Sequence, residues 1–88
     1  MTNQRRNTWS REQIRSARRI ELAPLLEKRG LDLRDRGAGN VEPEHYRGIL
    51  IKASYWRWPE RDLSGNTIDF YLNILGLSFN DAMKEILR

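Results

Sequence analysis

Side chains that could hold a nucleic-acid strand gather in residues 46–61 of this 88-residue sequence. Four basic residues stand there against one acidic residue, Glu60. The basic residues are Arg47, Lys52, Arg57 and Arg61. An exposed ring such as that of Tyr55 can stack on a base, while guanidinium and ammonium groups contact phosphates. The stretch is therefore predicted to bind a single strand, and the alternative is a solvated strand face that packs against another domain.

A second basic cluster lies near the N-terminus and has helical spacing. Residues 1–20 contain six arginines and one glutamate, a local charge of +5, so the remainder sums to −1 within the net charge of +4. Four arginines fall near i, i+4, i+7 and i+8: Arg11, Arg15, Arg18 and Arg19. A helix would place them along one side, which suits contact with a phosphate backbone without base readout. The alternative is a solvated helix face or a linker.

Residues suited to catalysis or metal binding are scarce. The sequence has no cysteine, and its single histidine, His45, can neither build a structural metal site alone nor act as base for the scattered serines. Gly37 and Gly39 do not join a strand to a helix, so they form no phosphate-binding loop. We therefore expect no enzymatic activity from this chain alone, and neither a metal nor another cofactor.

Length and hydropathy define the broad class. A chain this short forms at most one domain with a modest core. No apolar run reaches the length of a membrane span or a signal-peptide core, so we expect no membrane association and a cytoplasmic location. Residues 1–8 are polar and lack periodicity, which divides the chain into a flexible basic arm, residues 1–9, and a single module, residues 10–88.

Two helices are predicted at the start of the module. Ser10 and Gln13 match a capping box and open a helix near residues 10–20. Pro24 interferes with its continuation, so a second helix is expected near residues 21–29, with Gly30 in a left-handed conformation at its end. A single kinked helix is the alternative.

Two further helices are predicted at the C-terminus. The first follows Ser64 or Asn66 as N-cap, has apolar residues on many sides and ends at Gly76, so it should be central. The second begins after Ser78 and is amphipathic. Its buried face should consist of Phe79, Ala82, Met83, Ile86 and Leu87.

A small antiparallel sheet of two to three strands is expected between these helices, giving an α+β fold. Residues 46–52 and 54–58 are rich in β-branched and aromatic residues, which predicts a tight hairpin or one bent strand ended by Pro59. Residues 31–45 contain glycines, an asparagine and a proline, so they predict a very short strand followed by a loop.

Alternation along residues 54–58 divides their side chains between two faces. Trp56 and Trp58 should face the core. Tyr55 and Arg57 should then form the exposed face, together with Arg47 or Lys52 from the neighbouring strand.

The order of elements resembles the zinc-binding N-terminal domain of bacterial DNA primases. "GNTIDFYLNILGLSFNDAMKEIL", residues 65–87, is similar to the closing segment of that family: glycine, a polar residue, an Ile-Asp-Phe triplet, a helix, glycine, and a Ser-Phe-x-x-Ala start to the last helix. "IELAPLLEKRG", residues 20–30, is similar to its opening helix. The resemblance covers about residues 18–88.

The zinc ligands of that family are missing. Counting back from Ile68 places Trp58 and Arg61 at the positions of its Cys-x-x-Cys pair, and residues 46–53 contain neither cysteine nor histidine. The chain thus resembles the zinc-less variant at the front of primase-like, Toprim-containing proteins of plasmids and other mobile elements. A buried Trp58 would cover roughly 150–250 Å² and replace part of the metal clamp by packing.

This resemblance implies a non-catalytic module that binds nucleic acid, single-stranded DNA in particular, within a primase-like replication protein. A downstream Toprim domain or other replication proteins would be its protein partners. One alternative is a protein-interaction or scaffolding domain that no longer binds DNA. Another, a helix-turn-helix reader, is disfavoured because its recognition helix would carry Asp81 and Glu85 toward phosphates.

Overall fold

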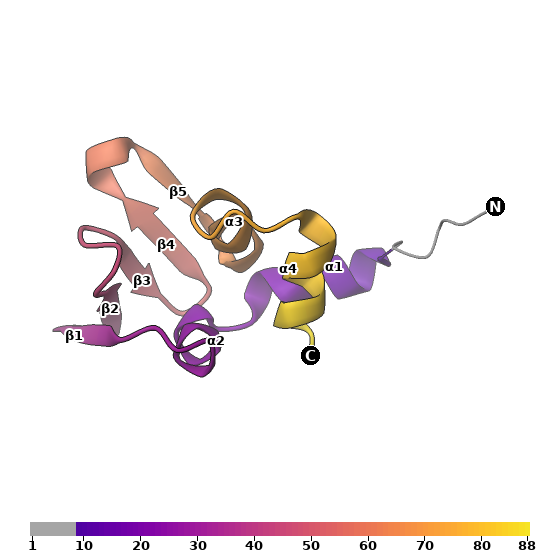
Figure 1. Cartoon of the computed structure of the whole chain (residues 1–88), viewed down its shortest axis with the longest axis horizontal. Coiled ribbons are helices and arrows are strands. Elements are labelled where there is room, and N and C mark those ends of the chain that lie inside the picture. The colour runs from indigo at the N-terminus through magenta and orange to yellow at the C-terminus, as the bar shows by residue number, and fades with distance from the viewer. Residues whose placement is uncertain (1–8) are drawn as a thin grey trace.

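The computed structural model of the chain describes residues 9–88. The prediction of a flexible arm falls on residues 1–8 outside this range, and on Trp9, whose indole Nε1–H donates to Asn80 Oδ1 at 3.0 Å. The elements follow one another as in Figure 1. They are α1 (Arg11–Arg19), α2 (Leu22–Lys28), β1 (Leu33–Gly37), β2 (Asn40–Pro43), β3 (Leu50–Lys52), β4 (Tyr55–Trp58), the 3₁₀ turn η2 (Pro59–Arg61), β5 (Leu63–Asn66), α3 (Thr67–Asn73) and α4 (Phe79–Ile86).

The α+β class is confirmed, but the sheet is larger than predicted. It has five antiparallel strands in the order β1-β2-β3-β4-β5, so each strand pairs with its neighbours in sequence. The expected hairpin of residues 46–58 is present as β3 and β4, joined through Ala53 and Ser54. The expectation of two to three strands was wrong at both edges of the sheet.

The first missed pair of strands lies where a loop was expected. β1 and β2 form a hairpin whose turn, Gly37, Ala38 and Gly39, has positive φ angles of 86°, 54° and 81°. The Asn40 amide donates to the carbonyl of Gly37 at 3.2 Å and closes this turn. Glycines that resemble loop residues in the sequence supply here the left-handed geometry of a tight hairpin.

The second missed strand, β5, precedes α3. Its residues Leu63–Asn66 pair with all four residues of β4, so the segment that contains both predicted N-cap candidates is a strand that runs directly into the helix. The reversal occurs one residue earlier, at Asp62, which has φ of 55°. Gly65 is required in this strand because a Cβ there would lie 2.5 Å from the Asp69 side chain.

The N-terminal helices follow the sequence prediction. Ser10 and Gln13 form both hydrogen bonds of the capping box. The chain is extended between the helices, and Pro24 occupies the first turn of α2, where its missing N–H interrupts no helical hydrogen bond. Gly30 has the expected left-handed conformation, with φ of 100°.

The C-terminal helices are also present. Asn66 caps α3 through a capping box with Asp69. α3 ends at Asn73, three residues before Gly76. Ser78 caps α4, in which Ala82, Met83 and Ile86 are buried. Phe79 was expected in that buried face but is 39% exposed, since it opens the helix at the surface.

One face of the sheet carries the core. α2 and α3 pack against it, while α1 and α4 pack on α3 at the helical end of the molecule (Figure 1). Trp56 is fully buried and meets the Phe70 ring edge to face at 5.6 Å between centroids. The Thr67 hydroxyl donates to the Ile20 carbonyl at 2.6 Å, which joins the α1–α2 link to α3. Among residues 9–88, no helix has the length and apolar character needed to span a bilayer.

Candidate nucleic-acid interface

The side chains of β4 alternate as predicted. Trp56 is fully buried and Trp58 is partly buried, whereas Arg57 is exposed and Tyr55 is 54% exposed. Strand geometry alone therefore turns the Tyr55 ring and the Arg57 guanidinium away from the core.

The sheet register places a lysine beside the exposed tyrosine. Lys52 lies directly opposite Tyr55, and Leu50 lies opposite Arg57. Directly opposed residues in an antiparallel pair share a face, and their Cβ atoms are about 4.5–5.5 Å apart. We call this surface the outer sheet face: Asn40, Leu50, Lys52, Tyr55, Arg57 and Ser64. An aromatic ring stands at its centre between two cations.

A hollow of about 210 Å³ adjoins the ring at the β4–β5 end. Its walls come from both strands and from the turn between them, and include Tyr55, Arg57 and Leu63. Leu63 is 40% exposed, so an apolar side chain is offered to solvent at this end of the sheet, and Asp62 adds an acidic group to the lining. The hollow thus combines apolar surface with charges of both signs.

Arg47 does not join this group. It lies in the loop between β2 and β3, close to Glu42, which is two residues along β2 from Asn40 and therefore on the same face of the strand. A hydrogen bond from the backbone N–H of Gly48, 2.7 Å from Glu42 Oε2, lowers the pKa of this carboxyl, and the charges of Arg36 and Arg47 lower it further. Arg47 therefore compensates an acidic group at the border of the outer sheet face.

Arg61 is directed to the other side of the sheet. Its guanidinium carbon lies 4.5 Å from the centroid of the Trp58 ring, a cation–π contact. Trp58 is three residues beyond Tyr55 and therefore on the opposite face. Of the five candidate residues in the 46–61 segment, the structure brings together Lys52, Tyr55 and Arg57.

Trp58 connects the loop between β2 and β3 with the turn that follows β4. It packs against Gly48, where a Cβ would lie 3.0 Å from the indole nitrogen, and under Arg61. The replacement of a metal clamp by this packing stays a prediction. The buried indole Nε1–H has no hydrogen-bond partner among the described residues, so packing and the cation–π contact hold the ring.

The arginines of α1 form a separate basic surface. Arg11, Arg15, Arg18 and Arg19 are all exposed, and none makes an ion pair with residues 9–88. Three of them, together with Ile14, border a hollow of about 260 Å³. The helix stands at the far end of the molecule from the β1–β2 hairpin (Figure 1).

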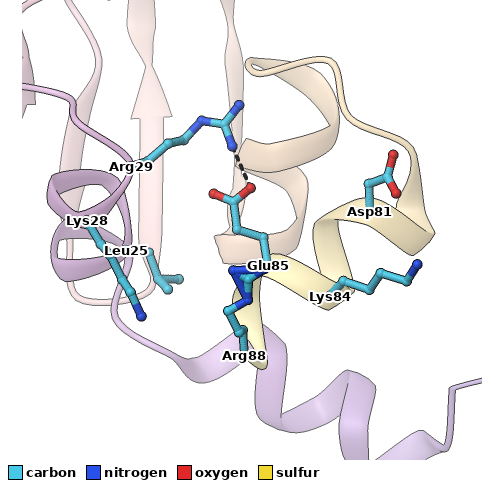
Figure 2. A pocket seen from close by; sticks show the side chains of 7 residues that line it. All are labelled: Leu25, Lys28, Arg29, Asp81, Lys84, Glu85 and Arg88. Atoms are coloured by element: carbon cyan, nitrogen blue, oxygen red, sulfur yellow. Dashed lines mark hydrogen bonds and ion pairs between the residues drawn. The ribbon is translucent and has the colours of Figure 1, made fainter.

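A further hollow, of about 310 Å³, lies between α2 and α4 (Figure 2). Arg29 Nη1 pairs there with Glu85 Oε1 at 2.5 Å. Figure 2 shows Lys28 and Lys84 directed away from each other, so these two cations do not converge on one point. Burial raises the pKa of the Tyr71 hydroxyl, and the nearby Glu85 carboxylate raises it further. This cluster connects helices and is not arranged to hold a ligand.

No group of three or more histidine, cysteine, aspartate or glutamate side chains suited to a metal ion occurs within residues 9–88. Comparisons with protein-family models, curated proteins and solved structures gave no match. The primase-like assignment therefore stays a prediction from the sequence.

Proposed function

We propose that this chain is a nucleic-acid-binding module that holds a single strand on the outer sheet face. The observation that carries the proposal is the placement of Tyr55, 54% exposed, between Lys52 on the neighbouring strand and Arg57 two residues along β4. Every base offers a flat face to an exposed ring, and the two flanking cations can meet adjacent phosphates.

The rigidity of the support favours this use. Tyr55 and Arg57 belong to a strand paired on both sides, and the intervening Trp56 is locked in the core. The ring is thus presented with little freedom to lose on binding. The chemistry required is binding alone, so we assign no catalytic residue, cofactor or metal to the chain.

The sequence resemblance supplies the biological context of the proposal. A module of this kind would serve a primase-like or mobile-element replication protein by holding single-stranded template, with catalysis in a Toprim or other domain. A cytoplasmic location follows from that role.

A protein-interaction domain is the second candidate. It is favoured by Leu50 and Leu63, which offer apolar surface on and beside the outer sheet face. Under this alternative the same face would pack against a neighbouring domain, and Tyr55 would be an anchor of that contact.

Fluorescence anisotropy with a labelled oligothymidine of roughly four nucleotides, within the range of single-strand sites, tests the proposal. We expect binding at low salt that weakens as salt is added and is weakened by about 1–3 kcal/mol in Tyr55→Ala. Tyr55→Phe keeps the ring and should bind like the wild type. Arg57→Ala should weaken binding, and its control is Lys28→Ala, which removes an exposed charge elsewhere. Absence of binding at low salt rejects the proposal and leaves the protein-interaction candidate.

A further inference from the structure

A second exposed aromatic residue lies at the helical end of the molecule, beside the basic helix. Phe79, the first residue of α4, is 39% exposed and lines a hollow of about 420 Å³ between α1, α3 and α4. We call this hollow the α1 groove, with its lining residues Ile14, Arg18, Asn66, Asp69, Leu72 and Phe79.

The α1 groove continues into the arginine surface of α1. Ile14 and Arg18 line both the α1 groove and the smaller hollow beside it, which is also bordered by Arg11 and Arg15. These three arginines form no ion pair within residues 9–88. The α1 groove therefore combines aliphatic and polar side chains, and Arg18 at its rim is followed by Arg11 and Arg15 in the adjoining hollow, where they can meet an anionic partner.

The α1 groove also reaches the outer sheet face. Asn66, which lines the groove, is the cross-strand neighbour of Tyr55 at the end of β5. The backbone at this junction is fixed, because the Asn66 carbonyl accepts from Trp56 and its N–H donates to Asp69 Oδ2 at 3.0 Å. Asp69 is the acidic residue of the lining, and this hydrogen bond engages its carboxylate.

We infer that the α1 groove binds a second part of the same single strand, with Phe79 as its stacking ring and Arg11, Arg15 and Arg18 at the phosphates. This inference rests on the proposed function of the outer sheet face. An exposed ring beside basic side chains, repeated on two adjoining surfaces, is the arrangement with which proteins follow a strand over several nucleotides.

The other conceivable occupants fit less well. An acidic amphipathic helix would match the arginines and the aliphatic side chains of the groove. It would not explain why the groove adjoins the exposed ring of Tyr55 through Asn66. Residues 1–8, "MTNQRRNT", contain no acidic residue, so their sequence does not complement the arginine rim. The acidic helix can be distinguished from a nucleic-acid strand by the experiment below.

The experiment compares oligothymidines of roughly four and roughly 16 nucleotides, the two ends of the usual range of site sizes. We expect Phe79→Ala and Arg18→Gln each to weaken binding of the longer strand about fivefold or more while leaving the shorter one unchanged. The longer strand can bind in more registers than the shorter one, which raises its apparent affinity. This number is the same for every variant, so it does not affect the ratio of variant to wild-type affinity. Should Phe79→Ala lower the melting temperature too far, Arg18→Gln carries the test.

Arg19→Gln is the matched control. Arg19 belongs to the same helix and is equally exposed, but it lines neither hollow. Equal losses for Arg18→Gln and Arg19→Gln, with no loss for Phe79→Ala, would mean attraction by charge alone and would overturn the inference.

Two further outcomes also contradict it. If none of these variants changes the affinity for the longer strand, binding is confined to the outer sheet face. Phe79-dependent binding of a glutamate-rich amphipathic peptide, in place of the longer strand, would assign the α1 groove to a protein partner. Failure of the shorter strand to bind the wild type rejects the proposed function itself and is thereby distinguished from failure of the extension.

Discussion

The indole Nε1–H of Trp56 donates to the backbone carbonyl of Asn66 at 2.9 Å, so one buried side chain of β4 fixes the residue that caps α3. Trp58, two residues along the same strand, has a buried Nε1–H without a partner among the described residues. The two tryptophans therefore carry the same indole N–H, which is hydrogen-bonded in Trp56 and not in Trp58.

Replacing each tryptophan by phenylalanine should separate these roles. Trp56→Phe removes a buried hydrogen bond to the Asn66 carbonyl, which keeps its place as acceptor of the first helical bond of α3, so we expect a loss of about 0.5–1.5 kcal/mol in the free energy of unfolding. Trp58→Phe removes no hydrogen bond and should cost less. Urea denaturation measures both, and equal losses would contradict the assigned roles. Trp58→Ala should nevertheless lower the melting temperature, and an unchanged melt would reject packing at Trp58 as a substitute for a metal clamp.

Gly65→Ala should destabilise the junction between β5 and α3. Its new Cβ would lie 2.5 Å from both the Cβ and a carboxylate oxygen of Asp69, so the capping box with Asn66 has to shift. We expect a loss of about 1–3 kcal/mol by thermal or urea denaturation. Ser64→Ala, one residue earlier at an exposed position of the same strand, should remain within about 0.5 kcal/mol of the wild type. A Gly65→Ala protein as stable as the wild type would show that the cap adjusts freely.

Tyr71→Phe should change stability mainly at alkaline pH. Because the pKa of Tyr71 is raised in the folded protein, the unfolded chain loses this proton first, near the ordinary value of 10.0. The wild-type free energy of unfolding should therefore fall as the pH rises above that value, and Tyr71→Phe should abolish this part of the fall.

Below pH 10.0, Tyr71→Phe should stay within about 1 kcal/mol of the wild type, because no group among residues 9–88 lies in hydrogen-bond geometry to the buried hydroxyl. Urea denaturation on both sides of that pH provides the test. An identical alkaline slope in the two proteins would contradict the shift.

Lys52 and Tyr55 should affect nucleic-acid binding in different ways. If the ammonium of Lys52 neutralises one phosphate, Lys52→Ala should reduce the slope of log K against log salt by about 0.7. Tyr55→Ala should weaken binding by about 1–3 kcal/mol while leaving the slope unchanged, because stacking releases no counterions. Titrations at several salt concentrations separate the two effects. A slope that changes equally in both variants would mean that Tyr55 does not stack.

Local patterns predicted the helices and the central hairpin well. The capping residues Ser10, Asn66 and Ser78 act through neighbours three residues away, and the alternation along β4 is a property of any strand. The grouping of Lys52, Tyr55 and Arg57 follows from that alternation and a short turn, so it could be predicted without tertiary information.

The missed features depend on contacts between segments. Glycines at 37 and 39 are equally compatible with a loop and with a tight hairpin, and only pairing with β3 decides between them. The position of Arg61 is determined by the ring of Trp58, and the exposure of Phe79 by where α4 begins relative to α1. No periodicity in the sequence records these relationships.

The sequential order of the five strands bears on how the protein folds. Every strand pairing joins neighbours in the chain, so the sheet can grow one short hairpin at a time without closing a long loop. The helical end is held by bonds across 47, 56 and 71 residues: Thr67 to Ile20, Arg29 to Glu85 and Trp9 to Asn80. We therefore expect the sheet to contain the folding nucleus and the docking of α1 on α4 to come late. The outer sheet face would then exist before the α1 groove, and kinetic intermediates would carry the first surface without the second.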